Sequence, residues 1–295
     1  MASRLMKVIW ESSGALIQKE IITNGDFLKK PTDRSKCRVK IYDMNFSASS
    51  LDGKNLEQVF MTDYLKPPYE EMMVTIGEAN GKVDECLERL IQSMFINEES
   101  SARITTRNEN SVSLDFMITL IDCEWSKPMW ELTPKEKYEL ALSYKEVGVG
   151  LHKSMRIIEA FFRFSKACKV LISMEPMEDH EIEDKLRNDI DDLRKVLYNN
   201  MAECHLMRKN YDHAVSLCDK VLGRDENNVK ALYRKAVANE NLKDYEKAFE
   251  YMEKVAALEP RNSAAKERLA IYKKKLLESK KSYDNIVKKM FHLNE

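Results

Sequence analysis

The sequence has no hydrophobic run that could cross a membrane, since no stretch approaches the roughly 18 apolar residues that a spanning helix needs. Its first residues include Arg4, Lys7 and Glu11 without a long apolar core, so a secretory signal is not expected there. The six cysteines form no Cys-x-x-Cys pair, which argues against a disulfide scaffold and against a zinc module. We therefore expect reduced thiols in a cytoplasmic protein, with entry into the nucleus left open.

Motifs of common catalytic sites are absent as well. The sequence contains no P-loop, no Gly-x-Ser-x-Gly, no His-Glu-x-x-His and no Gly-x-Gly-x-x-Gly. His205 follows Cys204 directly, and adjacent residues face different ways on a helix, so this pair does not form a metal site. We expect no metal and no cofactor.

The charge is nearly balanced, with 48 Lys and Arg against 49 Asp and Glu in 295 residues. Residues 1–125 carry 15 basic and 20 acidic side chains, a net charge of −5, which leaves 33 and 29, or +4, for the remainder. Neither excess is typical of a nucleic-acid-binding protein. With 43% hydrophobic residues, the chain can nevertheless form a core.

Glycine and proline divide the chain into two parts. Five of the eight glycines and five of the seven prolines precede Lys135, which predicts a β-containing domain at 1–125 and an all-helical domain at 135–295. The linker expected between them is 126–134. It ends in Thr133 and Pro134, and Glu136 completes a capping box that should start the first long helix.

Small residues recur in the helical half with the period of a helix–turn–helix tetratricopeptide repeat (TPR). Ala202 and Ala236 are 34 residues apart, as are Ala214 and Ala248. The same frame fits Gly148, Ala160, Phe164 and Ala167 earlier in the chain. We predict three repeats at about 135–174, 193–226 and 227–260, with an acidic insertion at 175–192 that forms a solvated loop and a helix extension. The first helices of the pairs should line a concave groove.

One more helix is predicted at 262–291, after Pro260. Its apolar residues fall on one stripe: Leu269, Tyr272, Leu276, Tyr283, Ile286, Val287 and Met290. The favoured interpretation is a capping helix over the last repeat. The alternative is a basic amphipathic helix that binds calmodulin or an anionic surface.

Strand patterns occupy the first half at 36–46, 72–77, 103–107 and 112–124, and an amphipathic helix is expected at 81–95. The segments 14–22, 38–42, 52–53, 74–78 and 112–125 resemble, in order, an FKBP-type peptidyl-prolyl isomerase domain. Together with the repeats, nearly the whole chain resembles the FKBP-like/TPR immunophilin co-chaperones. The resemblance implies an α+β fold, in which an FKBP-like sheet wraps a short helix and is followed by an all-α TPR domain with a C-terminal capping helix.

The expected isomerase pocket departs from the family pattern. Val83 stands at the position of the family's floor tryptophan, and Ala79 and Asn80 stand at apolar wall positions. The family's Phe-Asp pair corresponds to Leu56 and Glu57, and the late loop is missing because residues 108–111 are too short to hold it. Tyr42 alone keeps its pocket place. Without floor and lid, we expect neither catalysis nor tight binding of the family's macrolide drugs.

The resemblance also implies a groove for a chaperone tail. Many TPR co-chaperones hold the C-terminal Glu-Glu-Val-Asp of a heat-shock chaperone between Lys and Asn on the first helix, Asn on the third, and Lys and Arg on the fifth. By repeat position these correspond to Lys145, Val149, Asn200, Lys230 and Arg234. Four of the five match, and Val149 removes one hydrogen bond.

Two functions remain open from the sequence. The first is a non-catalytic adaptor or co-chaperone that binds a client protein, which the resemblance implies to be a casein-type kinase, through its FKBP-like and TPR surfaces. The second is a residual isomerase with a rebuilt pocket, although Trp10, Trp125 and Trp130 all lie away from the floor position. The segment 59–72, longer than the family needs, is either a partner contact or a packed loop. Oligomeric state is not predicted.

Overall fold

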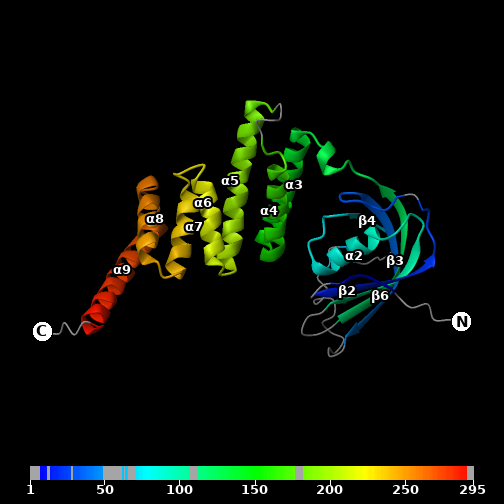
Figure 1. Cartoon of the computed structure of the whole chain (residues 1–295), viewed down its shortest axis with the longest axis horizontal. Coiled ribbons are helices and arrows are strands. Elements are labelled where there is room, and N and C mark those ends of the chain that lie inside the picture. The colour runs from blue at the N-terminus through cyan, green and yellow to red at the C-terminus, as the bar shows by residue number, and fades with distance from the viewer. Residues whose placement is uncertain are drawn as a thin grey trace. The chain divides into compact units, whose positions relative to one another are not determined.

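The computed structural model divides the chain into two compact units, Met1–Glu131 and Leu132–Glu295. It describes residues 7–11, 14–27, 29–48, 62, 64–65, 71–106, 112–176 and 182–290. A sheet and one helix form the described core of the first unit, whereas every regular element described in the second unit is helical (Figure 1). The predicted fold class is therefore confirmed.

The sheet of the first unit has six antiparallel strands in the order β1-β2-β5-β6-β3-β4. The strands are β1 (Lys7–Glu11), β2 (Ala15–Thr23), β3 (Lys36–Ala48), β4 (Glu71–Thr75), β5 (Glu99–Thr106) and β6 (Val112–Glu124). Neither the edge strand β1 nor β2 has a counterpart among the predicted strands. β5 begins at Glu99, four residues before the predicted start at 103.

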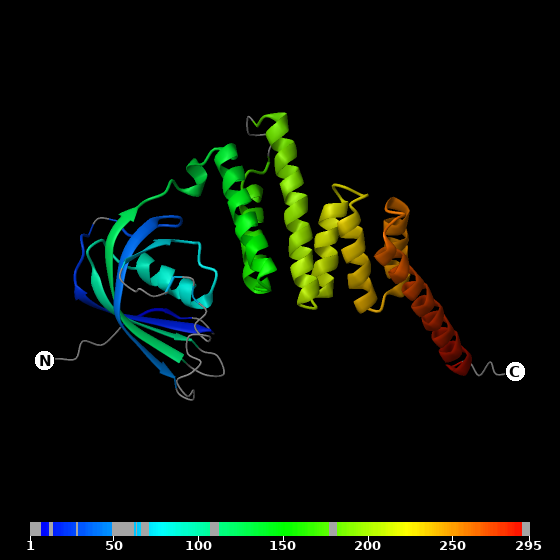
Figure 2. The ribbon, with the colours of Figure 1, turned by 180° about the vertical axis from the view of Figure 1, so that it is seen from behind.

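Helix α2 (Lys82–Gln92) covers one face of this curved sheet (Figure 2). Alternate residues of the strands point toward it and are buried, including Ile17, Val39 and Ile104. Leu87 and Ile91 of α2 pack into the same core, which is the arrangement expected of an amphipathic helix on a half-buried sheet.

The second unit consists of three antiparallel helix pairs and a terminal helix. The pairs are α3 (Pro134–Lys153) with α4 (Ile157–Ile172), α5 (Asp184–Met207) with α6 (Tyr211–Leu222), and α7 (Val229–Asn241) with α8 (Tyr245–Leu258). The last helix, α9 (Ser263–Met290), contacts α8. A short 3-10 helix, η1 (Met129–Glu131), lies within the predicted linker.

Local sequence signals account for the start of α3 and for the close pairing of the helices. The backbone amide of Glu136 donates to Thr133 Oγ1 at 3.2 Å, and the amide of Thr133 donates to Glu136 Oε2 at 2.8 Å, so the capping box is present. The small residues of the repeat frame, such as Ala202 and Ala236, are fully buried. A Cβ at Gly148 would lie 2.6 Å from the Phe164 ring, so only glycine allows α3 and α4 to approach this closely.

The helix extension expected within the acidic insertion is present, since α5 begins at Asp184, about two and a half turns before residue 193. α9 caps the last pair only with its first half, where Ala265 and Tyr272 are buried among residues of α7 and α8. No helix in the described part of the chain is long and apolar enough to cross a membrane.

Candidate functional site

A surface groove of about 410 Å3 lies between α5, the loop before α7 and the first turn of α7. Its walls are formed by Asp192, Lys195, Val196, Asn199, Asn200, Asp225, Asn228, Val229, Lys230 and Glu259. The groove therefore brings together two of the predicted tail-binding residues, Asn200 and Lys230. Asn200 is half-buried, whereas Lys230 is exposed to solvent.

The side chain of Asn228 fixes the geometry of this groove. Its Oδ1 accepts from the backbone amide of Ala231 at 3.1 Å, which caps α7, and also from Asn199 Nδ2 of α5 at 3.2 Å. Its own Nδ2 donates to Asp225 Oδ2 at 2.9 Å. Asn228 therefore caps α7 and also connects it to α5 by a hydrogen bond, which fixes the position of Lys230 in the first turn of α7.

Arg234 lies one turn after Lys230, on the same face of α7. Its Nε donates to Glu203 Oε2 at 2.6 Å, and its Nη1 donates to Asn199 Oδ1 at 3.2 Å. Nη2 makes no hydrogen bond among the described residues. The guanidinium is therefore held beside the groove through Asn199, with its Nε edge occupied by the carboxylate of Glu203.

The structure does not bring the remaining predicted residues to this groove. Lys145 and Val149 are half-buried on α3, and neither belongs to the groove wall. The long helix α5 contributes Asp192 and Val196 to the wall of the groove. Of the four predicted residues, Asn200 and Lys230 therefore line the groove, and Arg234 is connected to its wall by the hydrogen bond to Asn199.

Acidic side chains moderate the charge of the groove. Asp192, Asp225 and Glu259 lie in its wall with only two lysines. One of these, Lys195, is bound to Asp192 at 2.7 Å, and this hydrogen bond raises the pKa of the lysine above its usual value. Lys230 makes no ion pair among the described residues, so it is the cation of the wall that is open to an incoming carboxylate.

Sequence reasoning missed Asn199, Asn228 and Glu203. The position of Asn228, directly before α7, is a typical capping signal that could have been recognised. Glu203 lies three residues after Asn200 and so on a nearby face of α5, but its bond to Arg234 spans two repeats and has no local signature.

In the first unit, buried carboxylates of α2 occupy the region where the isomerase pocket was expected. Glu88 is 6% exposed, and its Oε2 accepts from the backbone amide of Gly77 at 2.8 Å. Its Oε1 accepts from the amide of Ala79 at 2.5 Å and from Tyr64 Oη at 2.9 Å. Burial and the neighbouring Glu88 both raise the pKa of Tyr64, so the phenol stays protonated and donates. These bonds tie the β4–α2 turn and Tyr64 to the helix.

The other pocket residues fall as follows. Val83 is buried in the first turn of α2, and Ala79 and Asn80 are half-buried in the turn before it. Leu56 and Glu57 lie outside the described residues. Of the insertion 59–72, Tyr64 and Leu65 pack against the core of the sheet, which favours a packed loop for that part.

The prediction for Tyr42 is wrong. Cys37, Val39 and Ile41 are the residues of β3 that face the core, so Tyr42 follows the exposed Lys40 to the other face of the sheet. Its hydroxyl donates to Glu99 of β5, and this bond raises the pKa of the phenol. Directly after it, Asp43 has a φ of 51°, and the register with β6 shifts between Tyr42 and Asn45. Tyr42 therefore does not belong to the remnant pocket.

Within the described ranges, no three His, Cys, Asp or Glu side chains are grouped as metal ligands would be. His205 instead packs against the ring of Phe161, with centroids 4.7 Å apart.

Comparison with known families identifies both units. Residues 10–125 match the model described as "BDBT FKBP like N-terminal", and residues 133–216 match "Bride of doubletime-like, TPR domain". A further tetratricopeptide repeat is matched at 229–262.

Two relatives match about 80% of this chain. The chain is 28% identical to the mouse FK506-binding protein-like over 237 residues, which is 80% of this chain and 59% of that protein. It is 26% identical to the protein Bride of doubletime of Drosophila melanogaster, over 80% of this chain and 81% of that protein. The solved structure of residues 1–211 of CG17282 covers 69% of this chain and 95% of its own, at 26% identity and a TM-score of 0.54.

Proposed function

Because this chain belongs to the FKBP-like/TPR proteins of the Bride of doubletime type, we propose that it is a non-catalytic adaptor. In this proposal the groove between α5 and α7 holds the C-terminal carboxylates of a partner, with a heat-shock chaperone tail as the candidate ligand. The FKBP-like unit binds a client protein, and the resemblance favours a casein-type kinase.

One observation carries the groove assignment. Asn200 and Lys230 lie in one wall, while Arg234 reaches the same wall through Asn199. An amide, an ammonium and a guanidinium are the donors that a terminal residue with two carboxylates requires, because each carboxylate oxygen must exchange its water for a fixed donor. Nη2 of Arg234 can donate a further hydrogen bond in a fixed direction, because the guanidinium is planar. The ammonium of a lysine at this position would be held less rigidly.

The absence of catalysis is supported by the first unit. A twisted prolyl amide is stabilised in a dry, apolar pocket with a hydrogen-bond donor in place. Here the floor position is an aliphatic side chain, Val83, and the carboxylate of Glu88 is bound to the turn that should carry the pocket wall. A carboxylate at this place adds negative charge where the reaction needs an apolar wall.

The tail-binding proposal is tested by calorimetry with a peptide that ends in Met-Glu-Glu-Val-Asp. We expect micromolar affinity at best, about −7 to −8 kcal/mol, because the peptide is short and the groove also contains acidic residues. The same peptide with an amidated C-terminus is the control, and it should bind at least about tenfold more weakly. Equal affinity of the two peptides would contradict carboxylate recognition.

A protease-coupled assay with an Ala-Leu-Pro-Phe peptide tests the absence of isomerase activity. The expected rate equals the uncatalysed rate of prolyl isomerisation, which takes roughly tens to hundreds of seconds at 25 °C. A rate well above it, proportional to protein concentration, would restore the residual isomerase as the function of the first unit.

A further inference from the structure

The apolar stripe of α9 changes from buried to exposed along the helix. Tyr272 is fully buried, whereas Tyr283, Ile286 and Met290 are 68%, 53% and 72% exposed. Leu276, Tyr283 and Met290 follow one another at seven-residue intervals, so the buried and exposed parts belong to one face. Figure 1 shows the corresponding end of α9 projecting away from α8.

The change occurs where α9 loses its anchor on α7. Glu240 accepts hydrogen bonds from Tyr272 Oη at 2.7 Å and from Lys275 Nζ at 2.8 Å, and it pairs with Arg268 at 3.2 Å. Burial alone would raise the pKa of Glu240, but the bonds to Lys275 and Tyr272 hold it below its usual value. Beyond Lys275, Lys280 is paired with Glu246 at the longer distance of 3.7 Å.

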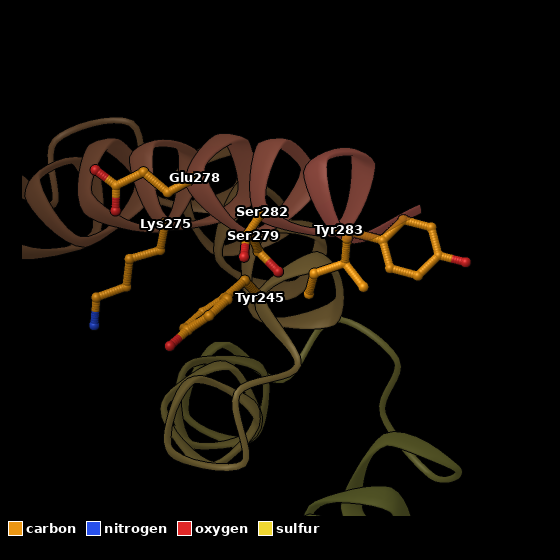
Figure 3. Close-up of a pocket in the computed structure, with 7 residues that line it drawn as sticks. Tyr245, Lys275, Glu278, Ser279, Ser282 and Tyr283 are labelled. Carbon is orange, nitrogen blue, oxygen red and sulfur yellow. The ribbon is translucent and has the colours of Figure 1, made fainter. Parts of the chain in front are cut away.

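A groove of about 460 Å3 opens at this point between α8 and α9. It is lined by Tyr245, Lys275, Glu278, Ser279, Ser282, Tyr283 and Ile286. Figure 3 shows Ser279 and Ser282 between the rings of Tyr245 and Tyr283. The small serines let a neighbouring helix come close, while the two rings and Ile286 offer apolar surface to its side chains.

The charge around this groove decides which helix can occupy it. Residues 273–290 contain seven lysines and two acidic residues, a net charge of +5. Two copies of this segment would repel each other, so pairing of α9 with a second α9 is disfavoured. Lys275 and Lys280 are paired within the protein, so an acidic helix would be attracted by the net positive charge of the whole segment.

We propose that the exposed stripe of α9, formed by Tyr283, Ile286 and Met290, together with Tyr245 of α8, is a docking groove for an acidic amphipathic helix of another protein. The partner helix continues the stacking of helices by one element, with apolar residues at positions one and four of each seven and glutamates beside them. This surface is separate from the groove between α5 and α7, so its test does not depend on tail binding.

The probe is a fluorescent synthetic peptide of about three seven-residue repeats, with leucine at positions one and four and glutamate or alanine elsewhere. Binding to the full chain is followed by fluorescence anisotropy. Ile286→Asp should weaken binding at least about tenfold. Leu277→Asp is the matched control, because Leu277 is equally exposed at 53% and lies nine residues, or about two and a half turns, away and so on the opposite face. It should change the affinity by less than about twofold.

Other outcomes would overturn the proposal. If both variants weaken binding equally, only the overall charge attracts the peptide and no groove is involved. The same conclusion would follow if a peptide of the same composition with scattered leucines bound equally well. Preference for phosphatidylserine vesicles over the peptide would assign the stripe to a membrane surface. A dimer in analytical ultracentrifugation that Ile286→Asp dissolves would assign it to a second copy.

Discussion

The remnant pocket of the first unit and the groove of the second differ in what their own side chains do. At the pocket, the carboxylate of Glu88 accepts from the amides of Gly77 and Ala79 and from Tyr64 Oη, so it is satisfied by the protein itself. At the groove, Lys230 is exposed and makes no ion pair with any residue that the structure describes, and Arg234 Nη2 makes no hydrogen bond to them. The first site is closed by internal polar bonds, while the second retains donors for a ligand.

Ligand binding and folding stability therefore compete for the same polar groups. A buried carboxylate with three donors stabilises a turn, but it can no longer take part in recognition. The bond between Arg234 and Glu203 is an intermediate case, because it holds the guanidinium in place and also competes with an incoming carboxylate. The contrast between the two sites can be tested by changing one charged side chain at a time.

The largest effect is expected for Glu88→Ala. It removes the carboxylate that accepts from the amides of Gly77 and Ala79 and from the hydroxyl of Tyr64, which should destabilise the first unit by about 3–5 kcal/mol. Urea unfolding followed by tryptophan fluorescence measures this, since all three tryptophans lie in the first unit. Glu85→Ala, on the exposed side of α2, is the control and should cost less than about 1 kcal/mol. A similar loss of unfolding free energy in both variants would contradict the conclusion that Glu88 holds the β4–α2 turn and Tyr64 against the helix.

A smaller effect is expected for Arg234→Ala. Removal of the guanidinium should weaken binding of the Met-Glu-Glu-Val-Asp peptide at least about tenfold, or about 1.4 kcal/mol, because a charge-assisted bond is lost. Arg224→Ala removes the same charge outside the groove wall and should weaken binding by less than about twofold. If calorimetry gives equal losses for the two variants, only the overall charge attracts the peptide.

The smallest effect is expected for Glu203→Gln, and its sign is opposite. Loss of the internal carboxylate frees one edge of Arg234, which should strengthen peptide binding about threefold. Glu250→Gln removes an equal charge from α8, where Glu250 pairs with Lys254, and should leave the affinity nearly unchanged. Weaker binding by Glu203→Gln would mean that Glu203 positions Arg234 and does not compete with the ligand.

The fold was predictable where local patterns and small residues carry it. The spacing of Ala202, Ala214, Ala236 and Ala248 predicts close helix pairs because a larger side chain would separate the axes. The capping box at Thr133 is likewise local. Tyr42 was misplaced because strand side chains alternate, so that a shift of one residue in the assumed alignment reverses the face.

The interactions that decide the sites were less predictable. Glu88 bonds to Gly77, and Glu203 bonds to Arg234, across distances in the chain for which the sequence gives no pattern. The stripe of α9 is uniform in sequence, yet only its first half is covered, since coverage depends on how far α8 extends. Burial of this kind follows from tertiary contacts and not from periodicity.

Hydrogen–deuterium exchange of the full chain, with and without the tail peptide, tests the contrast between the two sites most directly. The account predicts slower exchange of amides in the middle of α5 and the first turn of α7, around Asn200 and Lys230, with no change at Gly77 and Ala79. Addition of the Ala-Leu-Pro-Phe peptide should change neither region. Protection of the β4–α2 turn by either peptide, with none in α5 and α7, would contradict the account.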